Sequence, residues 1–181
     1  MSEKSRIWVV SMLEGGQYDK VKKIWRMFER KFGFVGVNFY YHPHVTYQGG
    51  TTNDLRGFRA DFEKLLLRLE PFRLQVSGLA NFNKKVIYLA VKETKKLCFI
   101  HRKIHSLMDK YCDDLDPLYA PGNWTPHATL VMEDLTEENF DKAWREINRN
   151  PMSFKQTISN YCIVKLYGKK AKNYKAYTIN R

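Results

Sequence analysis

The sequence lacks the features that mark several large classes of protein. It has only 3 cysteines in 181 residues and no C-x-x-C pair, which argues against a disulfide framework or a zinc knuckle. No segment approaches the roughly 20 apolar residues that a membrane-spanning helix needs. There is no glycine-rich phosphate loop and no dinucleotide-binding fingerprint. The first six residues lack the apolar region of a signal peptide, so we expect a cytoplasmic protein without a membrane segment.

The composition is that of a folded, basic protein. Hydrophobic residues make up 44% of the chain and aromatic residues 14%, which is enough for a packed interior. The formal net charge is +12, and no acidic residue follows Lys165. Such a field attracts polyanions, so RNA is the expected partner; the alternative is a solvated basic surface without a specific ligand.

Two tripeptides of one type, each preceded by proline, carry the strongest functional signal. They are His44-Val45-Thr46 and His127-Ala128-Thr129. In an extended strand, residues i and i+2 point to the same face, so each tripeptide would present an imidazole beside a hydroxyl. Two such pairs facing each other would surround one anion with two proton-transfer groups and two hydroxyl donors. That set suits phosphodiester chemistry, and it requires neither a metal nor a cofactor.

The order of predicted elements occurs twice. Strand, helix, His-x-Thr strand, helix and strand follow one another over residues 6–80 and again over residues 86–167, and His127 follows His44 by 83 residues. Hydrophobic periodicity predicts strands at 6–13, 72–79, 86–91, 154–167 and 174–179, with helices at 21–32, 53–70, 97–111 and 136–147. Gly33 should end the first helix, Gly49-Gly50 the first motif strand, and 168–173 should form a turn. A pseudo-twofold axis would bring both motifs to one cleft; chance alternation of elements is the alternative.

The two motifs resemble those of the 2H phosphoesterase superfamily. The resemblance is carried by Pro-His-Val-Thr at 43–46 and Trp-Thr-Pro-His-Ala-Thr-Leu at 124–130, set in a duplicated α+β pattern. It implies a single bilobal α+β domain over residues 1–181, with intertwined lobes and two antiparallel sheets that form a central groove with helices outside. It also implies that His44 and His127 are the paired catalytic histidines, and Thr46 and Thr129 the paired hydroxyl residues.

The resemblance implies a metal-independent phosphodiesterase that acts on RNA ends or short oligonucleotides, and we expect a monomer. The bond could be a 2′-5′ linkage, a 2′,3′-cyclic phosphate or a linkage of a signalling oligonucleotide. Two alternatives stay open: a non-catalytic RNA-binding module and a reversible 2′-5′ RNA ligase. Many ligase-like members carry an arginine just after the second motif, where this chain has Leu130-Val131-Met132.

Strand alternation and loop position suggest further substrate-binding residues. In the strand at 154–167, Cys162, Val164 and Leu166 should face the helices, which would turn Tyr161, Lys165 and Tyr167 into the cleft. Lys165 and Arg73 are the candidates for the missing phosphate cation. Three aromatic residues in the predicted loops before the motifs are candidates for stacking on bases: Tyr40, Tyr119 and Trp124.

One histidine pair has the spacing of a metal site. His101 and His105 stand four residues apart on a predicted helix, but Arg102 occupies the place where a zinc protease has glutamate. Because both histidines flank the apolar stripe of that helix, we expect them at the boundary between core and solvent.

Overall fold

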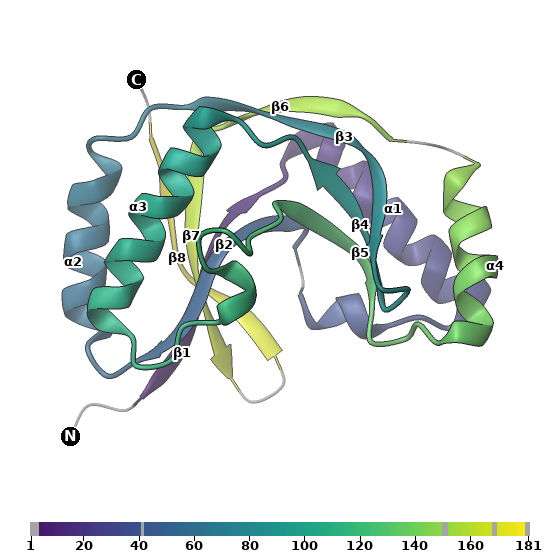
Figure 1. The fold of residues 1–181 in the computed structure, drawn as a ribbon, viewed down its shortest axis with the longest axis horizontal. Coiled ribbons are helices and arrows are strands. Elements are labelled where there is room, and N and C mark those ends of the chain that lie inside the picture. The colour runs from purple at the N-terminus through teal and green to yellow at the C-terminus, as the bar shows by residue number, and fades with distance from the viewer. Residues whose placement is uncertain (1–3, 41, 150–151, 168–169, 180–181) are drawn as a thin grey trace.

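The computed structural model describes residues 4–40, 42–149, 152–167 and 170–179. Two four-stranded antiparallel sheets lie side by side, and helices cover their outer faces (Figure 1). The elements in chain order are β1 (Ser5–Met12), α1 (Gly15–Phe32), β2 (His44–Thr52), α2 (Leu55–Leu66), β3 (Phe72–Phe82), β4 (Val86–Val91), α3 (Lys95–Tyr111), β5 (His127–Met132), α4 (Glu137–Asn148), β6 (Phe154–Ile158), β7 (Asn160–Tyr167) and β8 (Lys170–Thr178). The expected α+β fold with two antiparallel sheets is confirmed. None of the helices in these ranges is long and apolar enough to cross a bilayer.

The two repeats exchange strands and helices. The strand orders are β2-β1-β7-β8 in the first sheet and β5-β4-β3-β6 in the second. β3, which ends the first repeat, pairs with β4, which opens the second; β7 of the second repeat pairs with β1 of the first. Likewise α3 packs behind β2, and α1 packs behind β5 (Figure 1). Each sheet and its helical cover therefore draw on both halves of the chain.

Helix ends follow the capping chemistry of the sequence. α1 ends at Gly33, whose left-handed backbone (φ 72°) lets its N–H donate to the Glu29 carbonyl. α4 begins after Thr136 with a capping box, in which Thr136 and Asn139 each bond the other's backbone N–H. The predicted strand at 86–91 is β4 with the same bounds.

Three strand predictions are wrong. β2 does not end at Gly49-Gly50 but continues to Thr52, because β1 pairs with it along its whole length. β8 begins at Lys170 and so occupies most of the turn predicted at 168–173; residues 168 and 169 lie outside the described residues. The strand predicted at 154–167 is two strands: β6 pairs with β3 in one sheet, and β7 pairs with β1 in the other.

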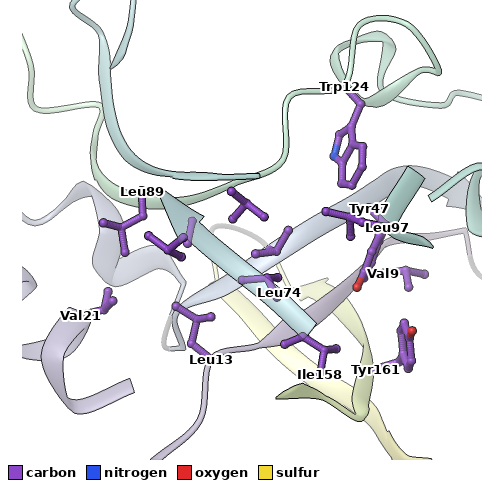
Figure 2. Close-up of a cluster of buried hydrophobic side chains, with 14 of the residues drawn as sticks. Val9, Leu13, Val21, Tyr47, Leu74, Leu89, Leu97, Trp124, Ile158 and Tyr161 are labelled. Atoms are coloured by element: carbon purple, nitrogen blue, oxygen red, sulfur yellow. The ribbon is translucent and has the colours of Figure 1, made fainter. Parts of the chain in front are cut away.

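One hydrophobic core fills the space between the sheets and the helices. Figure 2 shows part of this core. Both sheets contribute side chains to it, among them Val9 of β1, Leu74 of β3 and Leu89 of β4. A second, smaller apolar cluster lies on the opposite face of the first sheet and includes Val10, Cys162 and Val164.

β7 is consequently apolar on both faces, and the facing predicted from its alternation is wrong. Tyr161 is fully buried on the helix side, where its ring lies 5.8 Å from Tyr47 and 6.5 Å from Phe62 of α2. Cys162 and Val164 face the groove instead, in the smaller apolar cluster.

Candidate active site

The two His-x-Thr tripeptides lie on the edge strands β2 and β5. Over the first four residues of each strand, half-buried and buried residues alternate, and the histidine and threonine are the half-buried pair. All four side chains line one cavity of about 410 Å³: His44, Thr46, His127 and Thr129. The fold thus brings together two motifs that lie 83 residues apart in the chain.

Each imidazole is fixed through the same hydrogen bond. Nδ1–H of His44 donates to the carbonyl oxygen of His42 at 2.7 Å, and Nδ1–H of His127 donates to that of Thr125, also at 2.7 Å. A carbonyl can only accept, so Nδ1 must carry the proton in both rings. In the neutral imidazoles, Nε2 is then the basic nitrogen.

Both histidines favour the neutral form. Burial lowers the pKa of His44 to about 4; the bond to the His42 carbonyl opposes this shift, and the charge of nearby His127 adds to it. Burial also lowers the pKa of His127, against the effect of its bond to Thr125. Each ring packs edge-on against an aromatic neighbour at 5.1 Å, Tyr40 for His44 and Phe82 for His127.

Two tryptophans hold the backbone of the motif threonines. Nε1–H of Trp124 donates to the carbonyl of Thr46 at 2.9 Å, and Nε1–H of Trp25 donates to that of Thr129 at 3.2 Å. Trp124 is only 8% exposed, and its ring stacks on that of His101 of α3, with the ring centres 3.9 Å apart and the ring planes 4° from parallel. Its buried ring has no free face for a base, so the expectation that Trp124 stacks on substrate is wrong.

Aromatic side chains form the rest of the wall. Tyr40 and Tyr119 line the cavity, although contact with a base stays a prediction for both. Burial raises the pKa of Tyr40 and of Tyr119, so both hydroxyls keep their protons and can donate. Phe82 also lines the cavity, and the ring centres of Tyr88 and His127 lie 5.1 Å apart. The sequence analysis predicted neither residue at the site. Tyr88 pairs with Thr129 across β4 and β5, and this register could have indicated it once the two strands were known to be neighbours.

Sequence comparison assigns the chain to a family. A sequence model of the 2′-5′ RNA ligase superfamily matches residues 40–170, a range that contains both motifs. The chain belongs to the 2′-5′ RNA ligase superfamily. Its members are 2H phosphoesterases, so the resemblance read from the two motifs is confirmed.

Solved structures with little sequence identity share the fold of this superfamily member. Escherichia coli LigT complexed with 3′-AMP has a TM-score of 0.62 at 12% identity, covering 99% of this chain and 100% of that one. TT0787 of Thermus thermophilus has a TM-score of 0.69 at 16% identity, covering 96% and 97%. A search of curated proteins by sequence found no match.

The side chains predicted to bind the substrate phosphate through their positive charge lie away from the cavity. Lys165 pairs with Ile7, a core residue, and so lies on the helix-facing side of its sheet rather than in the groove. Arg73 is exposed on β3 and does not line the cavity, nor does Tyr167, which is 51% exposed at the end of β7. No lysine or arginine is among the described residues that line it. The three predicted contacts are therefore not brought to the site.

The histidine pair on α3 has a structural place behind this wall. His101 is 3% exposed, not at a boundary as expected, and its Nε2–H donates to the carbonyl of Tyr119 at 2.9 Å. His105 forms a 2.8 Å hydrogen bond through Nδ1 with the side-chain amide of Gln48. Within the described ranges, no three histidine, cysteine or carboxylate side chains are grouped so that they could hold a metal ion.

Proposed function

We propose that this member of the superfamily is a metal-independent phosphodiesterase that cleaves RNA-type phosphodiesters. The observation that carries the proposal is the matched state of the two histidines. Both line the same cavity, and both have Nδ1–H fixed on a carbonyl two residues earlier, which reserves Nε2 for proton transfer. A pair of imidazoles around one phosphorus can act as general base and general acid.

The chemistry follows from this arrangement. One neutral imidazole takes the proton of the attacking oxygen, which is a ribose hydroxyl beside the phosphodiester or a water molecule. The new P–O bond forms in line as the bond to the leaving oxygen breaks, and the second imidazole, protonated on Nε2, gives its proton to that oxygen. Each such group contributes about 10²–10⁴ in rate.

Neutral donors would stabilise the charge on the phosphate. The Thr46 and Thr129 hydroxyls stand beside the imidazoles, and the Tyr40 and Tyr119 hydroxyls line the same cavity. In a cavity that largely excludes water, hydrogen-bond donors aimed at the non-bridging oxygens stabilise the negative charge that builds on them in the transition state. Since no lysine or arginine of the described residues lines it, these hydroxyls carry that task in our proposal.

The substrate is proposed to be an RNA end or a short oligonucleotide. The cavity of about 410 Å³ is of the size that small-molecule sites have, and its aromatic wall suits a nucleobase. The net charge of +12 favours approach of a polyanion. The linkage cut would be a 2′-5′ bond, a 2′,3′-cyclic phosphate or a bond of a signalling oligonucleotide.

One assay tests the proposal. The protein is incubated in EDTA with 2′-5′ oligoadenylate, 3′-5′ oligoadenylate and a 2′,3′-cyclic nucleotide, and the products are separated by chromatography. We expect turnover of at least one substrate and a loss of at least a hundredfold in His44→Asn and His127→Asn. Asparagine can keep the hydrogen bond to the carbonyl but has no atom at Nε2. Binding without turnover of any of the three would instead identify an RNA-binding module.

A further inference from the structure

A second hollow adjoins the cavity on the His44 side. It measures about 70 Å³ and shares four lining residues with the larger cavity: Tyr40, His44, Thr46 and Tyr119. Its remaining walls are Trp8, Val10, Asp116 and Val164. The two hollows therefore meet at one histidine-threonine pair, and the second one extends the site over the concave face of the first sheet.

Trp8 forms the floor of this extension. It pairs with Gly49 across β1 and β2, and a Cβ at position 49 would lie 1.8 Å from Nε1 of the indole. The indole thus rests on bare backbone, which only glycine leaves open. Tyr40 meets the ring edge-on, with centroids 6.5 Å apart. The ring is held in place and remains half-buried, so part of it faces the groove.

Trp8 differs from the other three tryptophans. Trp25 and Trp124 are 3% and 8% exposed and donate their N–H groups to strand carbonyls. Trp144 stacks on Phe140 within α4, on the outside of the second sheet. Of the four, Trp8 is the one that lines the hollow beside the motif residues.

We propose that Trp8 is the stacking platform for a second nucleobase, that of the nucleotide on the far side of the scissile phosphate. This inference rests on the proposed function and narrows its substrate class to linkages with a nucleoside on each side. The face of an indole ring can stack on any of the nucleobases, since each base has a π-face. The Arg6 guanidinium lies over the Trp8 ring, 5.6 Å from its centre, so a base that stacks on this face would displace the guanidinium outwards and then lie between it and the indole.

The carboxylate in the wall of the hollow favours a base over a further phosphate at that position. Asp116 lines it, and a carboxylate repels a phosphate but accepts hydrogen bonds from the N–H groups of a base. One oxygen of Asp116 already accepts from the N–H of Leu118, which fixes the carboxylate beside the platform. Asp114 lies further along and is engaged by the backbone N–H of Thr51 at 2.6 Å, so the acidic loop is anchored to β2.

Binding measurements test the platform independently of turnover. The probes are AMP and an adenylyl dinucleotide whose leaving oxygen at the linkage is replaced by a methylene group, so that neither a ribose hydroxyl nor water can cleave it. We expect the wild-type protein to bind the dinucleotide at least about tenfold more tightly than AMP. Trp8→Ala should bring this ratio close to one while the affinity for AMP is kept, and Trp8→Phe should retain part of it. The matched control Trp144→Ala should leave the ratio unchanged.

Tryptophan fluorescence provides a second measurement with milder variants. A stacked base quenches indole emission, so the dinucleotide should quench the wild-type protein and Trp144→Phe, but not Trp8→Phe. A dinucleotide-to-AMP ratio that survives in Trp8→Ala, or quenching that survives in Trp8→Phe, overturns the inference. If no substrate is turned over but the ratio behaves as expected, the platform stands and the catalytic proposal fails.

Discussion

The indole N–H of Trp124 donates a hydrogen bond to the carbonyl oxygen of Thr46 at 2.9 Å. β2 is the edge strand of its sheet, and an edge strand presents carbonyl groups that no neighbouring strand pairs with. The Trp124 ring stacks on His101, which in turn donates to the carbonyl of Tyr119. This pair of rings therefore ties α3 to two walls of the cavity.

Replacing Trp124 with phenylalanine should keep the ring stack and lose the hydrogen bond. A buried carbonyl left without a donor costs about 1–3 kcal/mol, so the free energy of unfolding should fall by that amount. Turnover should fall as well, because the backbone of Thr46 loses its fixed position. Denaturant unfolding and steady-state kinetics measure the two effects. Trp144→Phe is the control, and equal midpoints for both variants would contradict the role of the bond.

The pH dependence of activity should reflect the lowered pKa values of both histidines. The reactive state has one imidazole neutral and the other protonated, so kcat/KM peaks between the two apparent pKa values of the pair. Burial lowers the pKa of His44 to about 4 and lowers that of His127 too. We expect kcat/KM to peak below pH 6.5. The charge of a bound phosphate raises both pKa values, so kcat should peak at a higher pH. A kcat/KM optimum above pH 7.5 would contradict this account.

Stability should fall in mild acid for the same reason. The pKa of His44 is about 4 in the folded protein and near 6.5 in the unfolded chain. At pH values between about 4 and 6.5, the unfolded chain therefore binds one more proton than the folded protein. The contribution of neutral His44 is complete above pH 6.5 and is lost as the pH falls towards 4. Denaturant unfolding at pH 7.5 and 4.5 measures the loss, which should be smaller in His44→Asn. An equal loss in both proteins would show that His44 does not contribute.

Much of the site could be predicted because its signals are local. The alternation of His44 and Thr46 with buried neighbours depends only on strand geometry, and Thr136 caps its helix through residues three positions away. The repeat in element order predicts that both motifs meet at one cleft, and in the structure all four motif side chains line one cavity.

The rest depends on which elements become neighbours. β7 is buried on both faces, so the alternation of its residues does not indicate which face meets the groove, and the prediction that Lys165 faces the groove is wrong. Trp124 stands in a loop, and only its packing on His101 from a distant helix makes it a structural residue. Trp8 and Gly49 pair across two strands, and neither is part of a local motif.

The threonine hydroxyls should act in the transition state more than in substrate binding. Thr46→Val and Thr129→Val each replace the hydroxyl with a methyl group on a half-buried strand position and leave the backbone bonds to the tryptophans in place. Loss of one donor to the phosphate should lower kcat by about 10²–10³ with little change in KM. Serine at either position restores the hydroxyl and should recover most of the rate, measured on the substrate that the wild-type protein turns over fastest. If valine instead raised KM and left kcat unchanged, the threonine hydroxyls would stabilise bound substrate rather than the transition state, and the charge that builds on the non-bridging oxygens would have to be stabilised by Tyr40 and Tyr119.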